Sequence, residues 1–204
     1  MATPISFQFD AATHIYSFAG VKIPSVTQIL EGAGLVDYAG IPKETLDYAA
    51  KRGTAVHMAS VFFDQDDLDP DSVDPQVAKY LAGWKKFRED HSFKIIESER
   101  AHLGTLDGML YGMTVDRVVE LGNGNAAILD IKCSTKVHRW TGVQLAGYAI
   151  GLCSGDLPAA FRKLAVQLRP DCTYKLYEYN DPKYAEIFGC ALKIAYWKDG
   201  FKPR

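Results

Sequence analysis

Residues 126–133 read Ala-Ala-Ile-Leu-Asp-Ile-Lys-Cys, an apolar run that holds one carboxylate, Asp130, and one lysine, Lys132. Its length and composition predict a buried strand. Side chains of a strand alternate between two faces, so Asp130 and Lys132 share one face, and Leu129 and Ile131 share the face that belongs in the core. An exposed Asp–Lys pair contributes under about 1 kcal/mol and is common. Two charges in so apolar a strand are costly, and we interpret them as functional.

Two further strands precede this one, and turn residues join all three. The expected strands are Phe93–Leu103 and Met109–Leu121. Asp107-Gly108 connects the first to the second, and Gly122-Asn123-Gly124 connects the second to the strand at 126–133. Both connections are typical of β-hairpins, so we expect a three-stranded antiparallel meander.

The lengths of the two loops determine which residues face one another across this meander. A two-residue first loop places Glu99 opposite Asp116, and a three-residue second loop places Asp116 opposite Asp130. A two-residue second loop would instead place Asp130 opposite Arg117, on the other face of the sheet. We favour the three-residue loop because it leaves Asp130 outside the core and Ile131 inside it.

Carboxylates gathered on one face of a sheet predict a cation site. Glu99, Asp116 and Asp130 would raise one another's pKa unless a cation lay between them. Oxygen-rich clusters of this kind hold Mg²⁺ or Mn²⁺. Beside them, Lys132 could orient or deprotonate a water molecule, or stabilise charge that develops on a phosphoryl oxygen.

The rest of the chain is expected to alternate between short strands and helices. A small hairpin is predicted from Ile5–Phe9 and His14–Phe18, followed by a short helix that Ser25 would cap. The other expected elements are helices from Pro42 to about Phe63, Pro75 to about Asp90, about Arg139 to Cys153 and from Pro182 onward, and strands near Leu164–Arg169 and Tyr174–Tyr179.

Composition narrows the class of protein. The 204 residues are 48% apolar and 24% charged, and a chain of this length can bury roughly 70% of its extended surface without disulfides or metals. No apolar run approaches the roughly 20 residues that cross a bilayer, and the first residues lack a signal-peptide pattern. We therefore expect a one-domain cytoplasmic protein and no membrane partner.

The formal net charge of −2 conceals two unlike halves. Residues 1–130 carry 11 Lys and Arg against 19 Asp and Glu, whereas residues 131–204 carry 12 against 6. A basic half suits a phosphate-bearing partner, and an acidic half suits hard cations. Six aspartates fall within residues 64–74, but that segment lacks the central Gly and final Glu of an EF-hand loop. We expect it to be a solvated surface loop.

The four cysteines, Cys133, Cys153, Cys172 and Cys190, form no CxxC pair. A zinc ribbon and a disulfide framework are therefore not predicted. Buried free thiols are the expected state, because free cysteine is among the residues most often found in cores.

Four motifs in chain order resemble the PD-(D/E)XK nuclease superfamily, in its RecB-like exonuclease branch. They are Arg52-Gly53-Thr54-Ala55-Val56-His57, Gly112-Met113-Thr114-Val115-Asp116-Arg117-Val118, Leu129-Asp130-Ile131-Lys132-Cys133-Ser134 and Gln144-Leu145-Ala146-Gly147-Tyr148. Upstream, Tyr16-x-x-x-Gly20 and Pro24-Ser25-Val26-Thr27 are similar to the opening segment of phage-encoded exonucleases of this type. The resemblance spans about residues 14–180. It implies an α/β restriction-endonuclease-like core, with a mixed central β-sheet flanked by α-helices.

The resemblance also implies a metal centre. Asp116 and Asp130 would be the metal carboxylates, with His57 and the Ile131 carbonyl as further ligands to one or two Mg²⁺ or Mn²⁺ ions. Some relatives carry an iron–sulfur cluster on four cysteines. Here all four cysteines follow Asp130 without clustering, so we expect no iron–sulfur cluster.

Other residues receive roles by the same resemblance. Lys132 would be the catalytic lysine, and Glu99 the acidic residue before the GxxxD motif, although Glu97 could take that place. The residues implied to contact DNA or support the metal site are Arg52, Lys136, His138, Arg139, Trp140, Gln144 and Tyr148.

The expected protein is a divalent-metal-dependent DNA exonuclease that acts on linear duplex or single-stranded ends. The resemblance suggests a role in phage recombination or DNA processing, with a possible recombination or single-strand-binding partner, in a bacterial or phage-infected cell. We expect residues 1–204 to form one nuclease domain. Its parts would be an N-terminal hairpin and short helix (1–40), a helical segment carrying His57 (41–92), the catalytic core (93–180) and a C-terminal helix (181–204).

Three alternatives stay open at this point. The first is an endonuclease of the same fold, which would cut closed circular DNA. The second is a non-catalytic DNA-binding protein that retains the fold. The third is a metal-dependent phosphohydrolase that acts on small nucleotides, whose binding would lack the steep salt dependence of a polymer-binding protein.

Overall fold

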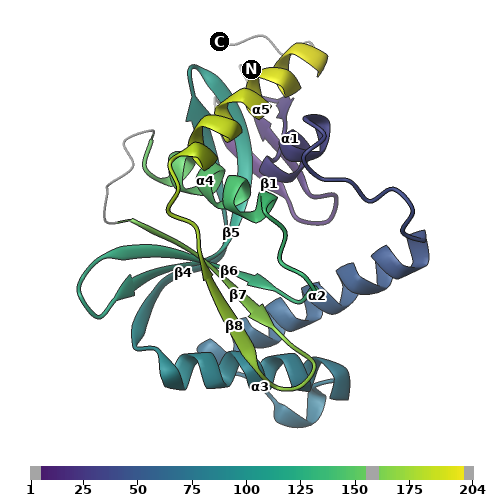
Figure 1. The fold of residues 1–204 in the computed structure, drawn as a ribbon, viewed down its shortest axis with the longest axis vertical. Helices are drawn as coiled ribbons and strands as arrows, with labels where there is room; N and C mark the ends of the chain where they lie inside the picture. Colours follow the sequence, from purple (N-terminus) through teal and green to yellow (C-terminus); the bar gives the residue numbers. More distant parts are fainter. Residues whose placement is uncertain (1–5, 155–160, 200–204) are drawn as a thin grey trace.

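The computed structural model describes residues 6–154 and 161–199. The strands are β1 (Phe7–Asp10), β2 (Ile15–Phe18), β3 (Val21–Ile23), β4 (Phe93–Leu106), β5 (Met109–Leu121), β6 (Ala126–Lys132), β7 (Arg162–Leu168) and β8 (Tyr174–Glu178). The helices are α1 (Val26–Gly32), α2 (Lys43–Asp64), α3 (Pro75–Asp90), α4 (Trp140–Leu152) and α5 (Lys183–Asp199), with a 3₁₀ turn at Pro70–Ser72. Figure 1 shows their arrangement.

The larger sheet has five strands in the order β4-β5-β6-β7-β8. Strands β6 and β7 are parallel, because α4 lies between them in sequence and carries the chain back across the sheet. All other neighbouring strands are antiparallel. The architecture is therefore α/β with a mixed sheet flanked by helices, consistent with a restriction-endonuclease-like core, and the predicted fold class is confirmed.

Both predicted loop lengths of the meander are confirmed. Leu106 pairs with Met109, so the first loop has two residues, and both have positive φ angles, 51° at Asp107 and 75° at Gly108. In the second hairpin, the Leu121 N–H donates to the Asn125 carbonyl at 2.8 Å, which leaves three residues in the loop. Two strand ends differ: β4 extends to Leu106, up to the turn, and does not stop at 103, and β6 ends at Lys132, one residue before Cys133.

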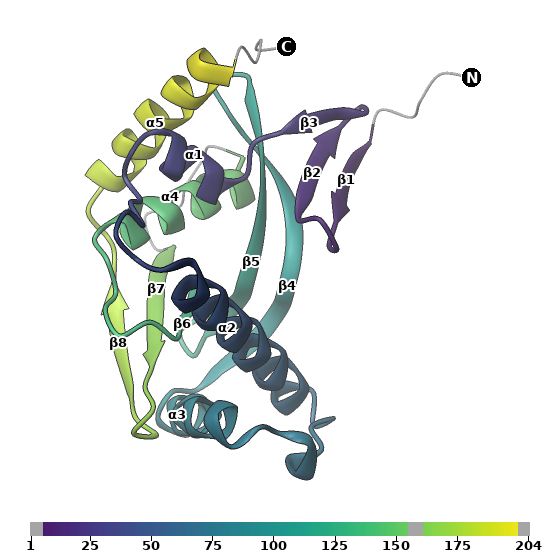
Figure 2. The same cartoon turned by 90° about the vertical axis from the view of Figure 1, so that its right-hand side faces the viewer.

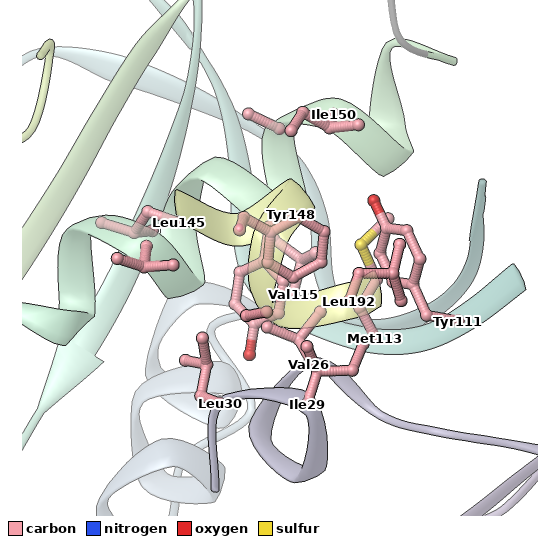
Figure 3. Packing of buried hydrophobic residues seen from close by; sticks show 14 of the residues in the cluster. Val26, Ile29, Leu30, Tyr111, Met113, Val115, Leu145, Tyr148, Ile150 and Leu192 are labelled. Atoms are coloured by element: carbon pink, nitrogen blue, oxygen red, sulfur yellow. The ribbon is translucent and has the colours of Figure 1, made fainter. Parts of the chain in front are cut away.

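The core consists of two clusters, one on each side of the larger sheet. Figure 3 shows the first cluster, where Leu30 of α1, Tyr148 of α4 and Leu192 of α5 meet side chains of β5 such as Met113. The second cluster packs Val56 of α2 and aromatic residues of α3 against Leu129 and Ile131 of β6 and against strand β7. Side chains alternate between the two faces of β6, so this one strand contributes residues to both clusters.

The small sheet contains a strand that the sequence analysis missed. Val21–Ile23 forms β3 and pairs with β2, because Ala19 and Gly20 have φ angles of 50° and 76° and turn the chain back on itself. Three residues are too few to show a hydrophobic period. In Figure 2 this sheet lies on one side of the long β4–β5 hairpin, with α1, α4 and α5 on the other. Ile5, the first residue of the predicted hairpin, lies outside the described residues.

The expectation of buried thiols is wrong for half of the cysteines. All four are free; Cys133 is buried and Cys153 partly buried, but Cys172 and Cys190 are exposed. Cys172 lies in the β7–β8 turn with a φ angle of 66°, and Cys190 lies on the exposed side of α5. Within the described ranges, no helix is long and apolar enough to cross a membrane.

Candidate active site

The site begins where two neighbouring strands part. Strands β5 and β6 pair as far as Arg117 and Leu129, whereas β6 continues to pair with β7 up to Lys132. In the gap, the Asp116 carboxylate accepts a hydrogen bond from the Ile131 backbone N–H at 2.7 Å. A side chain thus satisfies a backbone donor that would otherwise lack a ladder partner, and it is held close to the Ile131 carbonyl.

Helix α2 supplies His57 to this gap. Its Nε2 lies 3.0 Å from the Ile131 carbonyl oxygen, and its Nδ1 lies 3.1 Å from Glu99 Oε1 and 3.6 Å from Asp116 Oδ1. Together His57, Glu99 and Asp116 offer ligand atoms that all lie within 4.8 Å of one another. The structure therefore brings together three of the predicted residues, from one helix and two strands.

Glu99 reaches the site through an unusual backbone conformation. Its φ angle is 47°, a left-handed value that costs energy for a non-glycine residue within a strand. Just before it, the pairing of β4 with β5 shifts between Ile95 and Glu97. Glu97 forms ion pairs with Arg100 at 2.7 Å and His102 at 2.8 Å. The structure therefore favours Glu99 over Glu97 for the acidic position beside His57, because the irregular backbone separates two residues that a regular strand would place on one face.

Lys132 is held between a carboxylate and an amide. Its Nζ lies 2.8 Å from Asp130 Oδ2 and donates to Gln144 Oε1 at 2.9 Å. Gln144 in turn donates to the Tyr148 hydroxyl at 3.0 Å, so hydrogen bonds connect both of these α4 residues to the lysine. Asp130 Oδ2 is buried and, among the described residues, has no partner with hydrogen-bond geometry. The charged neighbour of that oxygen is the Lys132 ammonium.

Burial and the repulsion between neighbouring carboxylates raise the pKa values of the acidic groups in this cluster. Burial raises the pKa of Asp130 to about 6, although Lys132 opposes the rise. Burial also raises the pKa of Asp116, and Glu99 adds to that rise. Burial by itself would lower the pKa of His57, but the carboxylates of Asp116 and Glu99 raise it to about 9. The group holds protons more tightly than its members would in water, as expected of a site built for a cation.

The donor set fits Mg²⁺ or Mn²⁺. Both ions accept carboxylate and carbonyl oxygens, and Mn²⁺ also accepts imidazole nitrogen. The close group of His57, Glu99 and Asp116 agrees with this fit. Asp130 does not belong to that 4.8 Å group, since its carboxylate is drawn to Lys132.

The predicted basic and aromatic residues after Lys132 line a shared surface pocket. Lys136, His138, Arg139 and Trp140 line a pocket of about 570 Å³ at the start of α4. The His138 and Trp140 rings stack with centroids 5.9 Å apart, and the Trp140 centroid lies 5.8 Å from Lys132 Nζ. The pocket therefore adjoins the lysine of the site.

Arg52 is occupied by contacts within the protein. It donates to the Cys133 carbonyl at 3.1 Å, and its guanidinium lies over the rings of Tyr48 and Tyr80. These contacts tie α2 to the end of β6 and so fix the helix that carries His57.

A buried ion pair that the sequence did not predict lies behind the site. Arg117 is fully buried; it donates to Asp64 at 3.1 Å, to Ser60 at 2.8 Å and to the Asp116 carbonyl at 2.7 Å, and it lies 3.4 Å from Glu99 Oε1. Asp64, expected in a solvated loop, ends α2 with a side chain only 3% exposed. The available signal was an arginine between the valines of a strand predicted to lie in the centre of the sheet, since a buried arginine requires a carboxylate partner.

Comparisons with known proteins find the same fold in a solved structure. No family model matches the chain, and no curated protein sequence matches significantly. A crystal structure from Eubacterium rectale, described as "Putative exonuclease", matches with a TM-score of 0.56 at 14% identity, covering 87% of this chain and 82% of that chain. A second structure, of SSO0001, has a TM-score of 0.39 at 16% identity, covering 87% and 84%. At 14% identity, the first similarity shows that this chain shares a fold with the Eubacterium rectale protein.

Proposed function

We propose that this protein is a divalent-metal-dependent nuclease that hydrolyses DNA phosphodiester bonds at the ends of linear DNA. The observation that carries the proposal is the gap between β5 and β6, where His57, Glu99 and Asp116 lie together. Lys132 lies at the edge of this gap beside Asp130. The name of the solved structure with the same fold supports a nuclease.

The ions would be held by His57, Asp116 and Asp130, with Glu99 and the Ile131 carbonyl at hand. When bound there, Mg²⁺ or Mn²⁺ supplies an acidified water molecule and neutralises charge on the phosphoryl oxygens. The carboxylates lie on a strand pair and a buried backbone amide fixes Asp116, so the positions of the ligands are set before substrate binds.

Lys132 acts as a hydrogen-bond donor in this proposal. Burial would lower its pKa, but Asp130 and Asp116 raise it above the usual value. The side chain is therefore an ammonium at neutral pH. It orients the attacking water or donates to a phosphoryl oxygen, and it does not remove a proton. Gln144 and Tyr148 position it and touch no reacting atom.

DNA would follow the basic side of the site. Lys136 and Arg139 are exposed and lie in the pocket beside Trp140, so they can contact backbone phosphates while the ring stacks on a base. A role in phage recombination or DNA processing is supported by the resemblance of residues 16–27 to phage-encoded exonucleases.

The test compares end-labelled linear duplex, linear single strand and closed circular DNA, each with Mg²⁺, Mn²⁺ or EDTA. We expect loss of the linear substrates only, abolished by EDTA. Lys132→Ala should lower the rate by about 10²-fold or more while DNA binding in EDTA persists. Lys193→Ala removes an exposed lysine paired with Asp107 and serves as the matched control.

Other outcomes of this assay would favour the alternatives. Cutting of the closed circle would indicate an endonuclease. Binding of DNA without cleavage under either metal would indicate a DNA-binding protein that retains the fold. Hydrolysis of free nucleotides with no cleavage of DNA would indicate a phosphohydrolase.

A further inference from the structure

A groove of about 640 Å³ runs from the surface into the candidate site. One wall is the β1–β2 hairpin, with Phe9, Ala11 and His14; the other is one side of α2, with Met58, Val61 and Phe62. His57 and Glu99 also line it, so the groove ends at the proposed metal ligands.

The walls of this groove are apolar and open to solvent. Met58 is 53% exposed and Phe62 is 39% exposed, although both belong to residue types that normally pack inside. Across from them, the Phe9 ring stacks on Tyr16 at 4.6 Å and meets His14 edge-on at 5.2 Å, which fixes an aromatic surface. Exposed apolar surface that continues into a polar site is typical of a ligand groove.

The charge pattern argues against a path for the DNA backbone here. Among the described residues that line the groove, none is a lysine or an arginine, whereas the pocket at the start of α4 contains Lys136 and Arg139. Phosphates require cations, and bases require flat apolar surface. The two sides of the site therefore suit different parts of one strand.

The dimensions fit a short stretch of bases. From His57 to Phe62, α2 rises about 7.5 Å, at 1.5 Å per residue. Bases in a strand stack about 3.4 Å apart, so the wall accommodates about two of them. In a duplex the same bases are stacked inside the helix. The duplex exposes only its phosphates and the base edges in the grooves, and this apolar surface does not suit either of them.

We propose that the groove between α2 and the β1–β2 hairpin binds the unpaired terminal nucleobases of a DNA strand, so that the site acts on single-stranded or frayed ends. Met58 and Phe62 are the residues that determine this specificity. The inference rests on the proposed nuclease function and adds the form of the substrate.

The experiment compares four substrates of one sequence: a blunt duplex, a duplex with mismatched terminal pairs, a single strand, and a single strand with abasic terminal positions. The wild-type chain should cleave the mismatched duplex and the single strand about tenfold or more faster than the blunt duplex, measured as kcat/KM. For a Met58→Ala/Phe62→Ala variant, kcat/KM on the single strand should fall about tenfold, because the bases lose the side chains on which they stack. On the abasic strand, wild type and variant should be equal.

Ile194→Ala/Trp197→Ala is the matched control, since both residues are exposed apolar side chains on α5. It should behave as wild type on every substrate. Thermal unfolding of both variants checks that they fold. Equal rates on blunt and mismatched ends, or an equal loss by the variant on normal and abasic strands, would overturn the inference.

A second measurement separates the groove from the chemistry. Terminal 2-aminopurine in a single strand should be quenched on binding in EDTA, and the Met58→Ala/Phe62→Ala variant should abolish the quenching. Quenching without any cleavage under Mg²⁺ or Mn²⁺ would contradict the nuclease function and leave the base-binding groove standing. Cleavage without quenching would do the reverse. A dimer in solution that this variant disrupts would mean that a second copy fills the groove, and would also overturn the inference.

Discussion

At His57 one imidazole lies among two carboxylates and a backbone carbonyl, and without a cation its proton supplies the positive charge. Because the pKa is about 9 in the folded chain and 6.5 ordinarily, the stabilisation is complete below pH 6.5 and is lost as pH rises through 9. Asp130, with its pKa raised to about 6, acts in the same direction at lower pH. A proton and the proposed metal ion would therefore compete for this site.

We predict that the free energy of unfolding in EDTA falls between pH 6.5 and 9, by about 3 kcal/mol at most. Urea unfolding across that range measures it. Saturating Mg²⁺ should reduce the fall, because the ion replaces the lost positive charge, and His57→Gln should remove most of it. The same slope with and without Mg²⁺ would contradict a cation site at these residues.

Arg117 is the second residue for which burial determines how much a substitution changes the free energy of unfolding. Arg117→Met would leave the buried Asp64 carboxylate without its main cation, and we expect a loss of about 3–5 kcal/mol in unfolding free energy. Arg100→Met is the matched control, because Arg100 is 65% exposed and pairs with Glu97 at the surface; it should cost under about 1 kcal/mol. Equal losses would mean that the buried pair does not stabilise the site.

At the scale of elements, the small sheet is attached through one close approach. A Cβ at Gly112 would lie 2.1 Å from a ring carbon of Tyr16, and Tyr16 is buried with its hydroxyl 2.7 Å from Thr114. The Gly112 N–H also donates to the Pro24 carbonyl at 2.9 Å. The glycine therefore lets β2 lie directly on β5, and this contact holds the β1–β2 hairpin that forms one wall of the groove.

We predict that Gly112→Ala destabilises the chain by about 1–3 kcal/mol, because neither the buried ring nor the strand can move without loss of packing. Limited proteolysis should then cleave near residues 19–24 before the rest of the chain. Gly32→Ala adds a methyl group where nothing lies within 4 Å and should be neutral or slightly stabilising. Protection from protease unchanged by Gly112→Ala would show that the small sheet docks by other contacts.

At the scale of the molecule, the acidic half of the sequence supplies most of the proposed cation ligands, and the basic half supplies the residues proposed to contact phosphates. Glu99, Asp116 and Asp130 precede residue 131, while Lys132, Lys136 and Arg139 follow it, and the β5–β6 hairpin and α4 bring them side by side. Charge separation along the chain thus becomes charge separation across one site.

This arrangement predicts a salt-dependent affinity for DNA. Lys136→Ala/Arg139→Ala should reduce the slope of log K against log salt by about 1.4 for single strands, since each phosphate contact contributes about 0.7. Fluorescence anisotropy over a salt series in EDTA measures the slope. Lys175→Ala/Lys193→Ala, which removes two lysines outside that pocket, should leave it unchanged.

By itself the sequence determined the elements whose signals are local. The alternation at 126–133, the Asp107-Gly108 turn and the Gly122-Asn123-Gly124 loop sufficed to identify the three strands and both loop lengths, because side-chain period and loop length are properties of neighbouring residues. The capping of α1 by Ser25 and the start of α3 at Pro75 are of the same kind.

Only the tertiary structure decided the features that join distant segments. The Arg117–Asp64 pair spans 53 positions, the groove joins α2 to the β1–β2 hairpin, and the left-handed backbone at Glu99 separates it from Glu97. The physical reason is that a buried charge needs a partner without specifying which one, and that exposed apolar residues on a helix do not reveal what lies across from them. The packing of the helices and strands determines both, and packing depends on where every other element lies.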